Sequence, residues 1–294
     1  LLESGAGGRR LALVVNEFGQ VGIDGAALER SGAAPVVELP GGCVCCEAGS
    51  DFLLAVEELL DHAPEQIVIE TSGLAEPGGI IRRARAAGLP LDAVVAVADA
   101  LNLDAARAAS PVAEWQLRAA DLIVLSKVDA ASPAARAAAE AQLRALNARA
   151  AILPAAHGAV PAELLFGPRL APSDPAPTPG HADGFASFVW TGDTPLRRAA
   201  LEAALGALPA TVYRAKGLVH CSDAPWPDEL QLVCGRHALS AVRLRAPASP
   251  LNTVVLLGPA IGAQQPAIAA ALDACADTPE RAAAWWERYR ATFQ

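Results

Sequence analysis

Three cysteines lie within four positions of one another in the segment GGCVCC, residues 41–46. Cys43, Cys45 and Cys46 offer soft thiolates, which are ligands that Zn²⁺ and similar cations prefer. The flanking glycines favour an exposed loop in which the thiolates can converge, and they disfavour packing in a core. A redox pair of Cys43 and Cys46 is the competing interpretation, because C-x-x-C spacing also permits a disulfide. The segment therefore predicts a metal site or, failing that, a redox-active loop.

An acidic residue and a glycine follow a strand-like run in IVIETSG, residues 67–73. A carboxylate at the end of a buried strand, here Glu70, can hold the hydration shell of Mg²⁺. Gly73 lets a backbone N–H approach a terminal phosphate with no β-carbon in the way. This is the logic of a Walker B motif with Glu in place of Asp. The alternative is that Glu70 only ends a strand or caps the next turn.

The aliphatic run LIVL, residues 122–125, leads into Ser126, Lys127, Val128 and Asp129. This SKVD segment resembles the [NT]KxD motif with which GTPases read guanine. An Asp carboxylate can accept hydrogen bonds from the N1–H and the 2-amino group of guanine, a pair of donors that adenine lacks. The Lys stem would pack over the face of the nucleotide. The alternative interpretation is an ordinary surface Lys and Asp after a strand.

Five other metal-capable side chains are scattered through the second half of the chain: His181, His220, Cys221, Cys234 and His237. Their spacing fits no compact ligand pattern, so ordinary core or surface roles are favoured over a second metal site.

The first half of the chain contains the secondary structure that could position these residues. In it, short aliphatic runs alternate with longer helical patterns, which indicates an α/β fold with a parallel sheet covered by helices on both faces. The predicted strands are 11–15, 36–39, 66–70, 93–98, 122–126 and 150–153. The predicted helices are 51–61, capped by Ser50 or Asp51, and 133–148, capped by Ser132 with Pro133 in its first turn. Two of these strands end at the Glu70 and SKVD segments.

A proline-rich segment, residues 167–184, interrupts this pattern and predicts a linker. We therefore expect a domain over 1–166 and a smaller α+β domain over 185–294. The predicted strands of the second domain are 185–190, 217–221, 231–233 and 253–257, and its predicted helices are 195–208 and one that starts at 278.

Composition excludes several classes of protein. The 294 residues are 53% hydrophobic and carry 23 Lys and Arg against 32 Asp and Glu, a formal charge of −9 that disfavours a nucleic-acid partner. Apolar runs such as 93–98 are far shorter than the roughly 20 residues of a membrane helix. Six cysteines are too few for a disulfide scaffold in a chain of this length. The opening residues contain no secretory signal, so we expect a cytoplasmic protein.

The order and spacing of these segments resemble those of the CobW-type GTP-binding metallochaperones. The segments are NEFG at 16–19, GGCVCC, ETSGLAEP at 70–77, VADALN at 97–102 and SKVD. YRAKGLVHC at 213–221 and VVLLG at 254–258 are similar to the C-terminal domain of that family. The resemblance implies a nucleotide domain similar to those of HypB and UreG, with the fold of a P-loop NTPase. It also implies GTPase activity with GTP and Mg²⁺, and delivery of Zn²⁺ or Co²⁺ to a client metalloprotein or metal-insertion enzyme. A homodimer is one state that it allows.

The resemblance also implies roles for individual residues. Glu70 and Gly73 form the Walker B pair of the catalytic site. In nucleotide binding, the resemblance implies that Lys127 and Asp129 read guanine and that Ser126 supports the base loop. Asn16 and Glu17 match the switch-like NEFG segment and are also implied in nucleotide binding. Cys43, Cys45 and Cys46 form the metal site of the family.

One family feature does not occur in the sequence, the phosphate-binding loop GxxGxGK[ST]. Leu1 and Leu2 resemble the end of the helix that follows this loop, so we expect the chain to be truncated at its N-terminus and to bind GTP poorly. The strand before the loop would be central in the sheet, and its absence should leave unpaired ladder groups and an apolar slot. A non-hydrolytic metal-binding or metal-sensing protein is the alternative function, and a thiol redox protein is a third. The resemblance allows three pathways, cobalamin synthesis, nitrile hydratase maturation and zinc homeostasis, and no residue of the sequence distinguishes between them.

Overall fold

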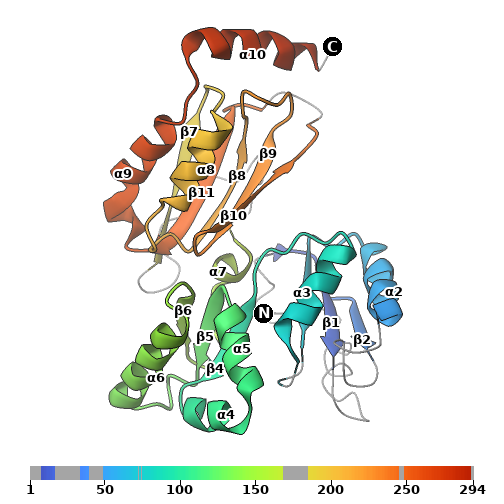
Figure 1. Cartoon of the computed structure of the whole chain (residues 1–294), viewed down its shortest axis with the longest axis vertical. Helices are drawn as coiled ribbons and strands as arrows, with labels where there is room; N and C mark the ends of the chain where they lie inside the picture. Colours follow the sequence, from blue (N-terminus) through green and yellow to red (C-terminus); the bar gives the residue numbers. More distant parts are fainter. Residues whose placement is uncertain are drawn as a thin grey trace. The chain divides into compact units, whose positions relative to one another are not determined.

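The computed structural model of the chain describes residues 8–16, 34–39, 49–71, 73, 75–167, 185–244 and 248–292. The chain divides into two units, Leu1–Ala162 and Glu163–Gln294, each with its own core (Figure 1). The predicted linker 167–184 lies outside the described residues except for Gly167. Among the described helices, none combines the length and apolar character that a bilayer-spanning segment requires.

The first parallel sheet of the first unit has the order β2-β1-β3. Its strands are β1 (Leu11–Asn16), β2 (Val36–Leu39) and β3 (Gln66–Glu70), which agree with the sequence-based prediction to within one residue. The helices beside it are α2 (Gly49–Leu60) and α3 (Pro77–Ala86). Val14 of β1, Phe52 of α2 and Ile80 of α3 belong to one buried cluster, so apolar burial holds these helices on the sheet.

The second parallel sheet has the order β4-β5-β6 and carries the SKVD segment. Its strands are β4 (Val95–Asp99), β5 (Leu122–Ser126) and β6 (Ala151–Ala155), and its helices are α4 (Leu103–Ala109), α5 (Pro111–Ala119) and α6 (Pro133–Leu146). The first four residues of β5 are buried, as expected for a central parallel strand. The predicted cap of α6 is confirmed, because the hydroxyl of Ser132 accepts a hydrogen bond from the N–H of Ala135 at 3.2 Å.

β3 and β4 are edge strands of these two sheets. Within the described part of the chain, β3 pairs only with β1 and β4 pairs only with β5. Val95 and Val97 of β4 are 41% and 72% exposed, although valines of a parallel strand are ordinarily covered. The unpaired edges and the exposed valines agree with the expectation that a central strand is missing from the sheet.

The second unit is built on an antiparallel sheet of order β10-β9-β8-β11-β7. After α7 (Ala162–Phe166) its elements are β7 (Phe185–Gly192), α8 (Arg198–Gly206), β8 (Arg214–Val219), β9 (Asp228–Val233), β10 (Arg236–Ala241), β11 (Asn252–Pro259), α9 (Ile261–Asp273) and α10 (Pro279–Ala291). Helices α8 and α9 lie on one face of the sheet (Figure 1). Leu201 of α8, Leu272 of α9 and Leu256 of β11 are fully buried in the resulting core.

Helix α10 is fastened to the second unit by aromatic side chains. The rings of Trp285 and Tyr289 stack at 4.6 Å, and both side chains are almost completely buried. The indole N–H of Trp285 donates to the carbonyl of Ala224 at 2.9 Å, and the Tyr289 hydroxyl accepts from the N–H of Ala248 at 3.1 Å. The same hydroxyl lies 3.2 Å from Nε2 of His220. Helix α10 is therefore part of the core of this unit.

Acid should destabilise the second unit through His220. This side chain is fully buried, and burial lowers its pKa from 6.5 to about 4. The unfolded chain takes up the proton near pH 6.5, so stability is complete above that pH and is lost as the pH falls toward 4. We expect a loss of about 2 kcal/mol in the free energy of unfolding between pH 7 and pH 5. Urea unfolding at the two pH values measures it by tryptophan fluorescence, because four of the five tryptophans lie in this unit.

The control for this effect is a pair of matched variants. His220→Gln should remove most of the difference between the two pH values, whereas His157→Gln, at an 85% exposed side chain of the first unit, should leave it unchanged. A wild-type protein with equal stability at pH 7 and pH 5 would contradict the expectation.

Candidate functional site

The carboxyl ends of β4, β5 and β6 bring together two of the segments singled out in the sequence. The register of the sheet pairs Asp99 with Ser126, and Ser126 with Ala155. Strands β4 and β5 therefore end at the same level, and the VADALN and SKVD segments lie at the same edge of the sheet. In open α/β sheets this is the edge where ligands bind.

Lys127 is held by the carboxylate of Asp99. The Lys127 ammonium donates to Oδ2 of Asp99 at 2.7 Å, across 28 residues of sequence. The same carboxylate accepts from the N–H of Leu101 at 2.8 Å and from the side-chain amide of Asn102 at 2.9 Å. The hydrogen bond from Lys127, followed by that from Asn102, lowers the pKa of Asp99 to about 2, so this carboxylate is ionised at neutral pH. Sequence analysis assigned Asp99 no role.

The backbone at Lys127 is unusual. Its φ of 59° lies in the left-handed region, which residues other than glycine seldom adopt. Such conformations persist where surrounding contacts fix them, and they cluster at functional sites. One of these contacts is the hydroxyl of Ser126, which donates to the carbonyl of Ala98 at 3.1 Å. The first half of the SKVD segment is therefore tied to the end of β4.

The second half of the segment is tied to the loop after β6. Oδ1 of Asp129 accepts from the N–H of His157 at 3.2 Å, and Nδ1 of His157 lies 3.7 Å from Oδ2 of Asp129. His157 and Gly158 both have positive φ, 50° and 73°, which turns this loop back toward SKVD. Asp129 remains 32% exposed, so its carboxylate can still reach a ligand. Sequence analysis left His157 without an assigned role as well.

Glu70 and Gly73 lie where the strand prediction placed them, at the end of β3 and in the loop that follows. Both are exposed. The amide of Gln116 in α5 donates to the carbonyls of Gly73 at 3.3 Å and Ala75 at 3.0 Å, which anchors the loop. A β-carbon at Gly73 would meet no heavy atom of the described residues within 4 Å. The position leaves Glu70 free to face a ligand, and its Walker B role stays a prediction.

The predicted metal residues cannot be placed. Cys43, Cys45, Cys46 and Glu17 lie outside the described residues, and only the backbone of Asn16, at the end of β1, is described. Elsewhere in the described chain no three His, Cys, Asp or Glu side chains gather to hold a metal.

The described cysteines of the second unit have buried thiols. Cys221, Cys234 and Cys275 form no disulfide, and burial raises the pKa of Cys221 to about 12. A thiol that stays protonated is a poor metal ligand and nucleophile. This agrees with the preference for packing roles over a second metal site.

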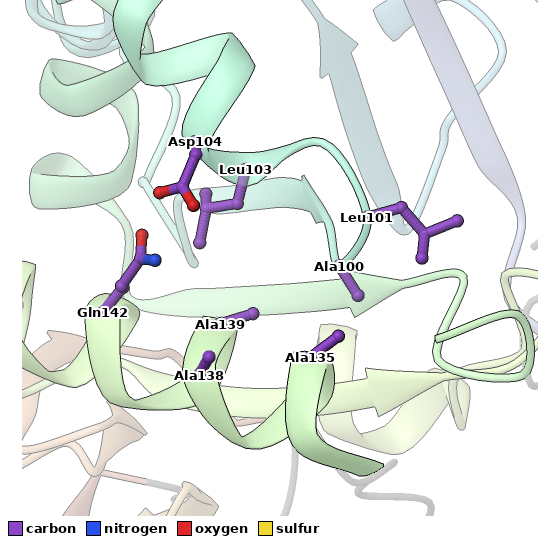
Figure 2. A pocket seen from close by; sticks show the side chains of 8 residues that line it. All are labelled: Ala100, Leu101, Leu103, Asp104, Ala135, Ala138, Ala139 and Gln142. Carbon is purple, nitrogen blue, oxygen red and sulfur yellow. The ribbon is translucent and has the colours of Figure 1, made fainter. Parts of the chain in front are cut away.

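A small cavity lies beside the SKVD loop, between α4 and α6, and Figure 2 shows its lining. Its volume is about 160 Å³, below the roughly 300–1,000 Å³ of typical ligand pockets. It is lined by Ala100, Leu101, Leu103, Asp104, Ala135, Ala138, Ala139 and Gln142. Since Lys127 and Asp129 are absent from this lining, the cavity is distinct from the candidate base site.

Comparisons with known proteins match both units. The nucleotide-binding domain described as CobW/HypB/UreG matches residues 1–154, and the cobalamin synthesis protein cobW C-terminal domain matches residues 185–276. The zinc chaperone CobW of Sinorhizobium sp is 33% identical over 196 residues, 55% of each chain. The zinc chaperone YeiR of Escherichia coli is 36% identical over 164 residues, 54% of this chain and 50% of that one. The chain thus spans about half the length of the curated relatives it matches. A solved structure of the Zn(II)-bound YjiA GTPase from E. coli aligns with a TM-score of 0.43 at 23% identity, over 94% of both chains.

Proposed function

Because the chain belongs to the CobW/HypB/UreG family, we propose that it is a GTP-dependent metal chaperone. It would bind GTP with Mg²⁺, bind Zn²⁺ or Co²⁺, and couple GTP hydrolysis to delivery of the metal to a client metalloprotein. The observation that carries the nucleotide half of this proposal is the base loop at the carboxyl edge of the second sheet. There Asp99, at the end of β4, holds Lys127, and His157, in the loop after β6, donates its N–H to Asp129.

This loop suits guanine for a chemical reason. The Asp129 carboxylate accepts hydrogen bonds from the two neighbouring N–H donors of guanine, and the Lys127 stem covers one face of the base. Adenine presents no such pair of donors, so it would leave the carboxylate unsatisfied. Glu70 at the end of β3 is an exposed carboxylate that fits a hydrated Mg²⁺, which would supply charge neutralisation at the phosphates.

The metal half of the proposal rests on the cysteine segment and on relatives whose names describe zinc chaperones. Cys43, Cys45 and Cys46 would hold the metal as thiolates. Asn16, the last residue of β1, and Glu17, which follows it in sequence, would respond to the state of the nucleotide. Loss of the γ-phosphate releases switch segments that it had ordered, and this would change the affinity for the metal.

A non-hydrolytic metal-binding protein is the second candidate. Such a protein would keep the cysteine site and have no turnover.

The test measures zinc affinity and GTP turnover for two proteins, the chain itself and the chain preceded by an aliphatic strand with a GxxGxGK[ST] loop. We expect both to bind zinc, and turnover to appear only in the extended protein, where the loop supplies the phosphate contacts. The combined substitutions Cys43→Ser, Cys45→Ser and Cys46→Ser should abolish zinc binding, whereas Cys275→Ala should not.

Three results would count against parts of this proposal. If the extended protein does not bind GTP, the proposed GTPase activity is refuted and the metal-binding alternative is supported. Equal zinc affinity with a GTP analogue and with GDP removes the coupling. Thiol reactivity that persists with metal bound favours a redox protein.

A further inference from the structure

We infer that Asp99 is a positioning residue for nucleotide-base recognition: it holds the ammonium of Lys127 at the end of β4, so that the Lys127 stem forms a fixed surface for a purine. This inference rests on the proposed guanine binding and extends it to a residue on a different strand. Asp99 itself touches the base loop only through Lys127 and is not expected to touch the nucleotide.

The carboxylate of Asp99 is held by other contacts besides the one with Lys127. Oδ1 accepts from the N–H of Leu101, and Oδ2 is shared by the Asn102 amide and the Lys127 ammonium. With both oxygens engaged on the α4 side, the carboxylate cannot rotate away from Lys127 without losing a hydrogen bond. Asp99 therefore presents a rigid anion rather than a mobile one.

The backbone fixes the other end of the Lys127 side chain. Register pairs Asp99 with Ser126, directly before Lys127, and the N–H of Val128 approaches the carbonyl of Ala155 at 3.4 Å. The left-handed φ of Lys127 then directs its side chain from a defined point. With both the Cα and the Nζ held, the four-carbon stem between them has little freedom left.

Stability alone gives little reason for this arrangement. The Lys127 side chain is 58% exposed, and an ion pair this exposed contributes little to folding. Strain at Lys127 works against even that gain. A strained, well-ordered and exposed lysine at the ligand edge of a sheet is better explained by pre-organisation for binding.

Composition supports a specific need for lysine at this position. The sequence contains two lysines, Lys127 and Lys216, among 23 basic residues, so the other 21 are arginines. Lysine differs from arginine in ending its unbranched stem in a compact charge. The planar guanidinium of arginine would place a fork of donors against Asp99 and shift the stem.

The scarcity of lysine also makes the inference easy to test on the chain itself. Reaction with an acetylating reagent, followed by peptide mass spectrometry, reports Lys127 and Lys216 separately. Lys216 pairs with Glu229 at 3.1 Å in the second unit and serves as the internal reference. In Asp99→Asn we expect Lys127 to react about fivefold faster and Lys216 at its original rate. The matched control is Asp104→Asn, which removes the same charge from an exposed residue of α4.

The second arm repeats the labelling with GDP or ADP present, on the protein extended by the aliphatic strand and GxxGxGK[ST] loop and on its variants. In this extended protein with Asp99 intact, GDP should protect Lys127 and ADP should not. In Asp99→Asn the GDP concentration for half-protection should rise about tenfold, while Asp104→Asn behaves as wild type. Asp99→Glu, which keeps the anion, should recover part of the protection.

The outcomes separate the inference from the proposed function. If GDP protects wild-type Lys127 but Asp99→Asn alters neither its labelling rate nor its protection by GDP, the positioning role is overturned and guanine binding stands. Faster labelling with unchanged protection overturns it as well. If GDP and ADP protect equally, or neither protects, guanine recognition itself fails, and the inference falls with it.

Discussion

Asp129→Asn is expected to weaken the binding of GDP about 100-fold and to leave the binding of ADP unchanged. The wild-type carboxylate offers two acceptor oxygens to the two donors of guanine, whereas the asparagine amide offers one acceptor and places an N–H₂ donor against the other guanine N–H. Hydrogen bonds to charged groups contribute about 1.5–3 kcal/mol each, so losing one and opposing its partner accounts for the factor. Titration calorimetry of GDP and ADP on the protein carrying the added GxxGxGK[ST] segment measures it.

The design distinguishes base recognition from damage to the fold. The asparagine oxygen can still accept the N–H of His157, so the loop after β6 keeps its contact. Asp104→Asn provides the same change of charge away from the base loop. Equal losses for GDP and ADP would indicate a damaged site, and an unchanged GDP affinity would refute guanine recognition by Asp129.

Trp285→Ala is expected to lower the stability of the second unit by about 4 kcal/mol. The side chain is 1% exposed, stacks on Tyr289 and donates its indole N–H to Ala224, so truncation leaves a large cavity and an orphaned carbonyl. Circular dichroism during urea unfolding measures the loss, because it does not depend on the fluorophore that the substitution removes.

The neighbouring tryptophan is the matched control. Trp286 is only half-buried and packs on the edges of Trp285 and Tyr289, so Trp286→Ala should cost less than half as much. Similar losses for the two variants would mean that α10 as a whole, rather than the buried indole, governs the stability. Helix α10 begins at Pro279, beyond the matched C-terminal domain of residues 185–276, yet it supplies core to this unit.

Strands with continuous aliphatic runs were predictable from sequence. β2, β3 and β5 have the predicted bounds, and each contains an aliphatic run typical of parallel strands. β4 was predicted as 93–98 and is Val95–Asp99, so the strand begins two residues later and ends one residue later than predicted. The residue added at its carboxyl end, Asp99, is the one that holds Lys127.

Other elements gave weaker signals. α9 contains Pro266, which interrupts a helical pattern, and β10 has the sequence RHALSA, a polar edge strand without regular alternation. α3 opens with Pro77 and two glycines, which disguise its start. Short helices such as α4 and α7 contain too few turns to show periodicity.

The chemistry of the base loop was predictable only in part. Lys127 and Asp129 follow one another in sequence and carry a recognisable spacing. Their partners do not, because Asp99 and His157 each lie 28 residues away and come into contact only through the register of three strands. An acidic residue ending a predicted strand was the one signal that could have found Asp99.

The open edges of β3 and β4 have a consequence for how the chain behaves in solution. Unpaired N–H and C=O groups beside Val95 and Val97 form a template for strands of other molecules, and sheet edges of this kind promote aggregation. The formal charge of −9 opposes such association through repulsion between chains, and salt screens that repulsion. The tendency of this protein to aggregate therefore depends on two opposing effects, strand pairing at the sheet edge and repulsion between acidic surfaces. Raising the ionic strength weakens the repulsion and should increase aggregation.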